Sequence, residues 1–208
     1  MSDTPGHLWL PKTALILASG SRTRAELLAN AGLVARVVKP SVDERAIEAE
    51  LQGLNPINLA HTLAEAKARE VAGRHPDCIT IGADQVLDVD GVVLHKAADL
   101  TEAHRHIDRL QGRRHALHSA VAVVADGKSE VFHDTAWLSM RCLNAEAIAA
   151  YLLLAGEDRV TSSVGGYQLE GLGIHLFERV EGDHSTVLGL PLIPLLAKLR
   201  MMGALAIA

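Results

Sequence analysis

The chain has 208 residues, of which 49% are hydrophobic but only 3% aromatic. This composition favours a core of Ala, Leu, Val and Ile in an α/β protein over a small all-β sandwich. The formal net charge of −5 gives no global basic field, which disfavours a protein that binds nucleic acids or anionic membranes non-specifically. Any anionic ligand must therefore be attracted by local groups.

The first predicted elements are a strand, a loop of small residues and a helix. Residues 13–18, TALILA, are typical of a buried strand, and the Ser-Gly-Ser loop at 19–21 ends it. Ser21 is a suitable N-cap for the helix that follows. Such a loop offers free N–H groups and hydroxyls at a positive helix end, where Arg22 and Arg24 add charge that suits a phosphate. The same residues are also consistent with an ordinary cap and two solvated arginines, because the loop matches neither the P-loop nor the dinucleotide-binding motif.

A second strand and an acidic segment come next. Residues 33–40 predict a strand closed by a proline. Residues 41–51 begin with a short acidic segment that contains Asp43 and Glu44. Carboxylates of this kind hold hard divalent cations against phosphates, although a polar helix start contains the same residue types. Asn55-Pro56 is then a typical helix start, and the periodicity of the following segment places Lys67 near the edge of its buried face.

Residues 78–94 combine a strongly apolar strand with a carboxylate. Asp84 follows CITIGA, and Asp90-Gly91 between apolar runs predicts a tight hairpin turn. Asp84 is either a turn former at the end of the strand or an acid placed at a sheet edge for metal or proton chemistry. The residues alone leave both interpretations open.

The remaining segments alternate between helices and strands. They predict a helix over 102–112 capped by Thr101, two antiparallel strands over 115–141 joined at Asp126-Gly127, a helix capped by Asn144, a glycine-rich segment over 162–191 and a closing helix over 190–202. This order suggests an α/β fold with a mixed twisted sheet flanked by helices, and two lobes around a central cleft. We expect one domain over 1–208, with 1–12 as a short N-terminal extension.

Several other kinds of protein are disfavoured. The chain has eleven histidines, but none has the cysteine spacing of a zinc site, and no serine lies in a G-x-S-x-G elbow. The N-terminus lacks a basic stretch followed by a long apolar one, and no apolar run approaches about 18 residues. We therefore expect a cytoplasmic protein without membrane or nucleic-acid partners.

Five motifs in order resemble those of the Maf family of nucleoside triphosphate pyrophosphatases, which are related in fold to the inosine triphosphatases. The resemblance runs from about Leu15 to Leu199. The matching stretches are LASGSRTRAELL at 17–28, VDE at 42–44, LAEAKA at 63–68, GADQVLDVDGVVLHKA at 82–97, and GGYQLEGLGIHLFERVEGDHSTVLGLP at 165–191.

The resemblance implies hydrolysis between the α- and β-phosphates of a nucleoside triphosphate, which gives a monophosphate and pyrophosphate. Asp84 is then the acceptor of the proton from the attacking water, and Glu44 with Asp84 places a divalent cation, Mg²⁺ or Mn²⁺. The implied contacts to the triphosphate are Ser19, Arg24, Lys67 and Lys96. The resemblance also implies a homodimer.

Three positions resemble the family determinants of base selection: Thr23, Gln85 and Glu170. Members similar to the thymidine and uridine triphosphate hydrolases carry Arg, Thr and Gln there, whereas those similar to the 7-methyl-GTP hydrolases carry Trp, Gln and Glu. This chain matches the second pattern at Gln85 and Glu170. A carboxylate at Glu170 can accept hydrogen bonds from guanine N1–H and N2–H₂, so we expect a purine preference, with 7-methyl-GTP as a candidate.

The sequence also departs from the family pattern. Arg22 and Thr23 stand where the family has proline and its first arginine, and His95-Lys96-Ala97 varies its GKP. These changes leave a competing hypothesis open, a regulatory nucleotide-binding protein of septum formation or cell division with little or no catalysis.

Overall fold

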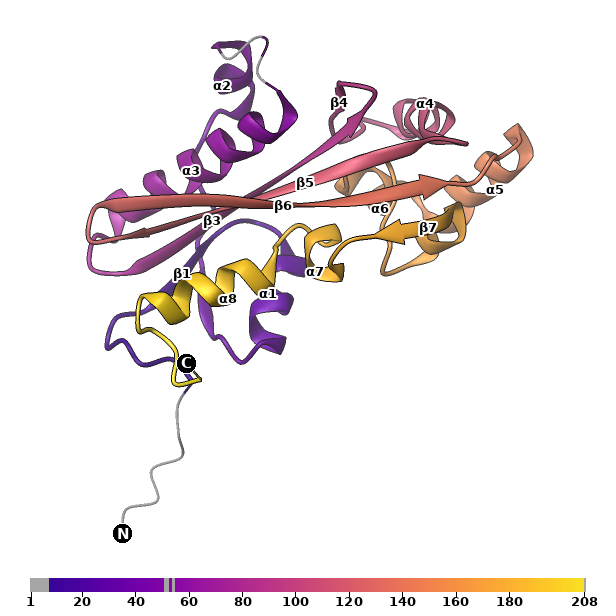
Figure 1. The fold of residues 1–208 in the computed structure, drawn as a ribbon. Helices are drawn as coiled ribbons and strands as arrows, with labels where there is room; N and C mark the ends of the chain where they lie inside the picture. The colour runs from indigo at the N-terminus through magenta and orange to yellow at the C-terminus, as the bar shows by residue number, and fades with distance from the viewer. Residues whose placement is uncertain (1–7, 51–52, 54, 208) are drawn as a thin grey trace.

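The computed structural model describes residues 8–50, 53 and 55–207, in which seven strands form one mixed sheet (Figure 1). The sheet order is β2-β1-β3-β5-β6-β7, and β4 pairs with β3 outside this path. The strands are β1 Leu15–Ala18, β2 Ala35–Val37, β3 Ile79–Val89, β4 Val92–Leu94, β5 Arg114–Ala125, β6 Lys128–Met140 and β7 Phe177–Glu181. The expected mixed α/β fold is confirmed.

Helices cover both faces of this sheet. In chain order they are α1 Arg22–Asn30, α2 Glu44–Glu50, α3 Pro56–Arg74, α4 Leu100–Leu110, α5 Ala145–Ala155, α6 Glu157–Ser162, the 3₁₀ helix η1 Leu172–Leu176, α7 His184–Val187 and α8 Leu192–Met201. No helix within the described ranges is long and apolar enough to cross a membrane.

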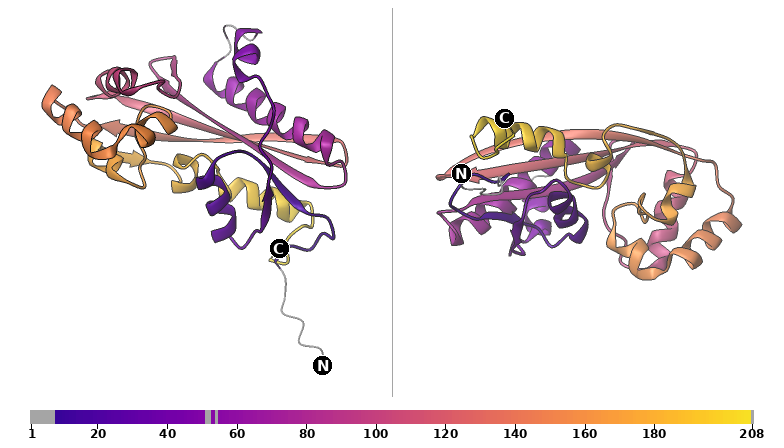
Figure 2. Two further views of the ribbon diagram at one scale, coloured as in Figure 1. Left: turned by 180° about the vertical axis from the view of Figure 1, so that it is seen from behind. Right: turned by 90° about the horizontal axis from the view of Figure 1, so that it is seen from below.

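The molecule has two lobes that share the long strands. In Figure 2, β5 and β6 run from the lobe of α1, α3 and α8 into the lobe of α4, α5 and α6. The first lobe has apolar clusters on the two faces of the sheet, and the second lobe has its own cluster around Ile107, Leu138 and Ile148. The single-domain extent stays a prediction, and residues 1–7 of the expected N-terminal extension lie outside the described residues.

Most predicted turns and caps are present, with one correction. The hairpin between β3 and β4 turns at Asp90 and Gly91, whose φ angles are +55° and +77°. Thr101 is not a cap, because α4 begins at Leu100 and Asp99 caps it by accepting a 2.8 Å hydrogen bond from the amide of Glu102. Asp99 lies three residues before Glu102, which is the spacing at which an N-cap side chain accepts from a helix amide, whereas Thr101 is already inside the helix.

Asp84 does not end a strand. It lies inside β3, and its two neighbouring strands stop short of it: β1 pairs with Ile79–Gly82, and β4 pairs with Leu87–Val89. Residues 83–86 therefore lie at a gap between two partner strands on that edge of β3. Successive side chains of a strand point to opposite faces, so Asp84 faces α3 while Gln85 faces the side of α1, α7 and α8.

Gly82 sets the distance between α3 and the sheet. A Cβ atom at this position would lie 2.6 Å from the amide nitrogen of Ala68 and closer still to the carbonyl oxygen of Ala64. Both are backbone atoms of α3, which therefore packs directly on the strand. Because Gly82 and Asp84 are on the same face of β3, this close approach brings Lys67 of α3 to Asp84.

We predict that Gly82→Ala destabilises the fold by about 1–3 kcal/mol, since the backbone of α3 must shift to admit the methyl group. Gly73→Ala is the matched control, because Gly73 lies on α3 itself and a Cβ there has no atom within 4 Å. The control should match or exceed wild-type stability through higher helix propensity. Urea unfolding measures both variants, and equal stability of the two would contradict the packing described here.

The core of the second lobe contains a titratable group. His115 of β5 is 1% exposed, and its Nε2 lies 2.7 Å from the hydroxyl of Tyr167. Burial lowers the pKa of His115 to about 4. The unfolded histidine therefore takes up a proton before the folded one as the pH falls.

We predict that neutral His115 makes its full contribution to the free energy of unfolding above about pH 6.5. This contribution, up to about 3 kcal/mol, is lost as the pH falls towards 4. Burial also lowers the pKa of His106 and His118, so variants are needed to isolate the effect. His115→Gln should flatten the loss of stability between pH 7 and 4, whereas His104→Gln, at an exposed position, should not. Identical slopes in the two variants would refute the assignment.

Candidate active site

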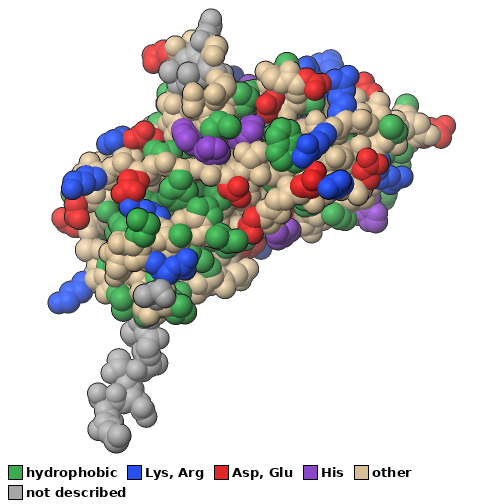
Figure 3. All heavy atoms as spheres, viewed as in Figure 1, with side chains coloured by type: hydrophobic (Ala, Val, Ile, Leu, Met, Phe, Trp, Pro, Cys, Tyr) green, Lys and Arg blue, Asp and Glu red, His purple; other side chains and the backbone are tan. Residues whose placement is uncertain are grey.

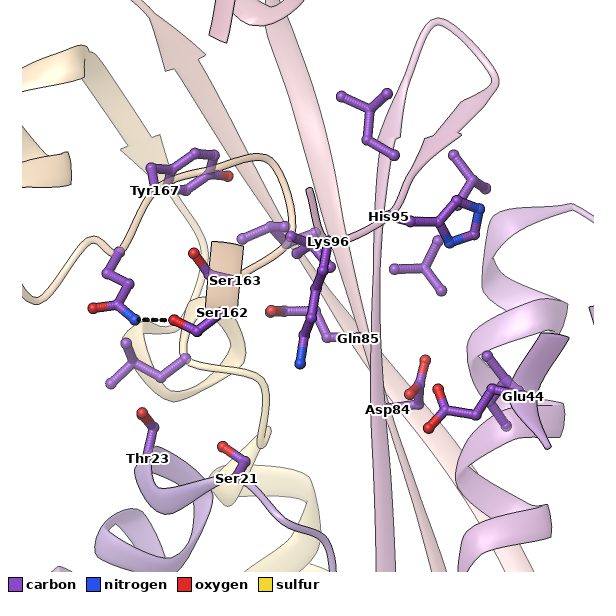
Figure 4. A pocket seen from close by; sticks show the side chains of 18 of the residues that line it. Ser21, Thr23, Glu44, Asp84, Gln85, His95, Lys96, Ser162, Ser163 and Tyr167 are labelled. Carbon is purple, nitrogen blue, oxygen red and sulfur yellow. Dashed lines mark hydrogen bonds between the residues drawn. The ribbon is translucent and has the colours of Figure 1, made fainter. Parts of the chain in front are cut away.

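A cleft of about 810 Å³ lies between the two lobes. One wall comes from α1, α2, α3 and the gap in β3, and the other comes from residues 162–170 (Figure 4). Acidic and basic side chains are interspersed on the face seen in Figure 3, so that face has no broad basic surface. Inside the cleft, Arg24, Lys67 and Lys96 are cations that can attract an anionic ligand locally.

A buried ion pair occupies the first wall. Lys67 Nζ lies 2.6 Å from Asp84 Oδ1 and 2.9 Å from Glu44 Oε1. Lys67 and Asp84 are each 7% exposed, so each charge depends on the other for compensation. Three segments far apart in sequence, α2, α3 and β3, thus place two carboxylates around one ammonium group.

The protonation of Asp84 is set by opposing effects. Burial raises the pKa of Asp84, while the charges of Lys67 and Arg24 act to lower it. Burial also lowers the pKa of Arg24, against the effects of Asp84 and Glu44. We consider desolvation dominant for Asp84, which makes its carboxylate more basic than an exposed one.

Arg24 is held from three sides. Its Nη1 donates to the carbonyl of Ala83 at 2.8 Å and to Ser19 Oγ at 3.2 Å, and its Nε donates to the carbonyl of Gly189 at 2.8 Å. The Ala83 carbonyl belongs to the gap in β3, so Arg24 takes a place that neither β1 nor β4 fills. Ser21 caps α1 as predicted, accepting from the amide of Arg24.

Ser19 lies beneath the cleft wall. It is 3% exposed, and its hydroxyl accepts hydrogen bonds from Arg24 and from the amide of Ser21. It is not among the described residues that line the cleft. In this structure Ser19 orders the loop and Arg24.

Gln85 is anchored to the segment that contains α7. Its Nε2 lies 2.9 Å from the carbonyl of Val187, 3.1 Å from that of Thr186 and 3.0 Å from Ser119 Oγ. Helix ends leave carbonyl groups without intrahelical partners, and α7 uses its own to hold Gln85. The Gly189 carbonyl that holds Arg24 follows directly, so one short segment positions both side chains.

The other predicted site residues also line the cleft. Lys96 is joined to the opposite wall by a bridge to Val164, and Figure 4 shows its amine pointing into the space between the walls. Thr23 is half-buried on α1, and Glu170 is exposed on the far loop. The structure therefore brings Arg24, Glu44, Lys67, Asp84, Gln85, Lys96, Thr23 and Glu170 to one cleft.

Sequence reasoning missed several lining residues. Arg45 and Glu48 of α2 line the cleft, as does His95, whose Nε2 lies 3.7 Å from Glu48 Oε2. Ser162 and Gln168 belong to the opposite wall, where the amide of Gln168 donates to the Ser162 hydroxyl at 3.1 Å. Arg45 and His95 are each adjacent in sequence to a predicted residue, which was the one signal available. The glycine-rich segment has no periodicity that would identify Ser162 and Gln168.

Comparisons with known proteins identify the family of this chain. The family model described as Maf-like protein matches residues 14–202. A nucleoside triphosphate pyrophosphatase of Rhodopseudomonas palustris (strain HaA2) is 50% identical over 202 residues, which cover 96% of this chain and 98% of the relative. A 7-methyl-GTP pyrophosphatase of Mesorhizobium japonicum is 49% identical over 194 residues, 92% of this chain and 97% of the relative. With a matching family model and relatives at this identity over nearly its whole length, the chain belongs to the Maf-like protein family.

Proposed function

We propose that the cleft binds a nucleoside triphosphate and hydrolyses its α–β phosphoanhydride bond, releasing a nucleoside monophosphate and pyrophosphate. The observation that carries this proposal is the buried Asp84, held beside Lys67 and Arg24 in a cleft of about 810 Å³. The names of the relatives, nucleoside triphosphate pyrophosphatase and 7-methyl-GTP pyrophosphatase, support it.

Asp84 is the proposed proton acceptor. Lys67 binds its Oδ1, which leaves Oδ2 to take a proton from the water that attacks the α-phosphorus. The pKa of Asp84, raised by burial, favours this transfer. Arg24, Lys67 and Lys96 provide positive charge for the triphosphate, and phosphoryl transfer depends mostly on such positioning and charge stabilisation.

The donor set fits a divalent cation of the Mg²⁺ or Mn²⁺ type. Glu44 and Asp84 converge on one point, where Lys67 Nζ contacts one oxygen of each, and carboxylate oxygens are hard ligands. The described residues contain no cluster of three metal-binding side chains, so phosphate oxygens and water would complete the shell, as is usual for Mg²⁺. Such an ion would supply charge neutralisation at the phosphates when bound.

We further propose a preference for purines, with 7-methyl-GTP as a candidate substrate. Gln85 and Glu170 both line the cleft, and Glu170 can accept hydrogen bonds from a guanine edge. Two relatives named 7-methyl-GTP pyrophosphatase, from Mesorhizobium japonicum and Rhizobium johnstonii, support this preference. A cytoplasmic location and a homodimer stay predictions.

We predict that Asp84→Asn lowers kcat for pyrophosphate release by about 100-fold or more, since the amide cannot accept the proton. Asp88→Asn is the matched control, on the same strand and face, where the carboxylate faces His118 at 3.8 Å and is not among the described lining residues. The control should keep wild-type turnover. Both variants are assayed with GTP, 7-methyl-GTP and UTP in the presence of Mg²⁺ or Mn²⁺.

Two outcomes would contradict the proposal. Orthophosphate as the first product would reject cleavage between the α- and β-phosphates. Nucleotide binding without turnover of any nucleotide by the wild type would favour the regulatory hypothesis of septum formation or cell division.

A further inference from the structure

Three adjacent strands converge on one residue of α7. Gln85 of β3, Ser119 of β5 and Asp134 of β6 stand opposite one another in the register of the sheet, so their side chains share one face. Each of them binds Thr186. Gln85 Nε2 and the Ser119 hydroxyl donate to its carbonyl at 3.1 and 2.8 Å, and Asp134 Oδ2 accepts from its hydroxyl at 2.7 Å. Thr186 is fully buried, so this cross-strand row fixes it against three strands.

The contact with Asp134 uses the side chain of Thr186, whereas the other two contacts use its carbonyl. A carboxylate that accepts from a hydroxyl makes a short, charge-assisted hydrogen bond, which is stronger than one between neutral groups. Oδ1 of the same carboxylate accepts from the amide of Thr135 at 2.9 Å, which orients the carboxylate in turn. The Thr186 hydroxyl is therefore the group through which β6 holds α7.

Thr186 is connected to Arg24 through one turn of backbone. The amide of Gly189 donates to the Thr186 carbonyl at 3.0 Å, and the carbonyl of Gly189 accepts from Arg24 Nε at 2.8 Å. Arg24 Nη1 donates in turn to the carbonyl of Ala83, the residue before Asp84. A chain of hydrogen bonds thus runs from β6, through Thr186 and Gly189, to the guanidinium group beside Asp84.

The contacts that hold Arg24 leave one end of its guanidinium group for a ligand. In the described part of the chain, the hydrogen bonds of this side chain come from Nε and Nη1, and Nη2 makes none. A guanidinium group is a rigid planar fork, so fixing Nε and Nη1 also fixes the direction of Nη2. Because Arg24 lines the cleft, Nη2 is the nitrogen left to donate to a phosphate there.

We propose that Thr186 and Asp134 are positioning residues, which set the direction of Arg24 towards the triphosphate through Gly189. Thr186 and Asp134 are not among the described residues that line the cleft, so they act on the substrate through Arg24. A misplacement of about 1 Å in a binding group can lower a rate by about 100-fold, so a contact outside the cleft can control the reaction. This inference rests on the proposed function, since it concerns the same substrate.

The first test removes the hydroxyl of Thr186. We expect Thr186→Val, which keeps the shape of the side chain, to lower kcat/KM for GTP by about tenfold or more. Thr186→Ser keeps a hydroxyl and should restore most of this loss. Thr135→Val is the matched control, because Thr135 follows Asp134 on β6 and its hydroxyl contacts His118 Nδ1 at 2.9 Å on the opposite face of the sheet. The control should keep the wild-type kcat/KM.

The decisive test asks whether Thr186 acts through Arg24. The probe is inorganic tripolyphosphate, which has no base and therefore reports on the cations without Gln85. Its affinity is measured by calorimetry in the absence of divalent cations. Thr186→Val should weaken this affinity by about tenfold in the wild-type background and have no further effect in Arg24→Ala, whose affinity is already reduced. A structural role alone would give the same loss in both backgrounds.

Three results would overturn the inference: no binding of the probe by the wild type, wild-type affinity in folded Thr186→Val, or an equal further loss in the Arg24→Ala background. If Thr186→Val does not fold, Asp134→Ala takes its place, because it removes the same hydrogen bond from a half-buried position. Binding of the probe does not depend on hydrolysis of GTP. A wild type without turnover would therefore reject the proposed function, and the affinities would still decide this inference.

Discussion

The close packing of α3 on Gly82 is the constraint on which the site depends. Without a side chain at this position, backbone atoms of Ala64 and Ala68 come within contact distance of the strand. Lys67, on the same helix, then reaches Asp84 at 2.6 Å in a place where neither residue is exposed by more than 7%. A buried charge without a partner is costly, so the helix, the strand and the ion pair stabilise one another only in this arrangement.

The gap in β3 divides the cleft into two chemical regions. Because β1 ends opposite Gly82 and β4 ends opposite Leu87, adjacent side chains of β3 reach the cleft from opposite faces of the sheet. Asp84 meets the cations, and Gln85 meets the carbonyls of the segment that contains α7. The Gly189 carbonyl of the same segment orients Arg24, so this segment supports both the Asp84 side and the Gln85 side of the cleft.

Local sequence patterns predicted the helix caps and turns better than they predicted the surroundings of the site residues. The Ser21 and Asn55 caps and the Asp90-Gly91 hairpin depend on neighbouring residues, and they appear as expected. The prediction of Thr101 as the cap of α4 was wrong because a second cap-forming side chain, Asp99, lies two residues before it. Asp84 lies inside a strand because it pairs with Ala120 of β5, and its other edge is open because β1 and β4 stop short of it; both are properties of the sheet. Ser19 is buried and accepts a hydrogen bond from Arg24, a contact that no local pattern predicts.

If water attacks the α-phosphorus at Asp84, the oxygen of that water ends in the nucleoside monophosphate. Hydrolysis of GTP in ¹⁸O-labelled water, followed by mass spectrometry of the products, shows where this oxygen goes. We expect one ¹⁸O atom in the nucleoside monophosphate and none in the pyrophosphate. Label in the pyrophosphate would place the attack at the β-phosphorus and contradict the proposed role of Asp84.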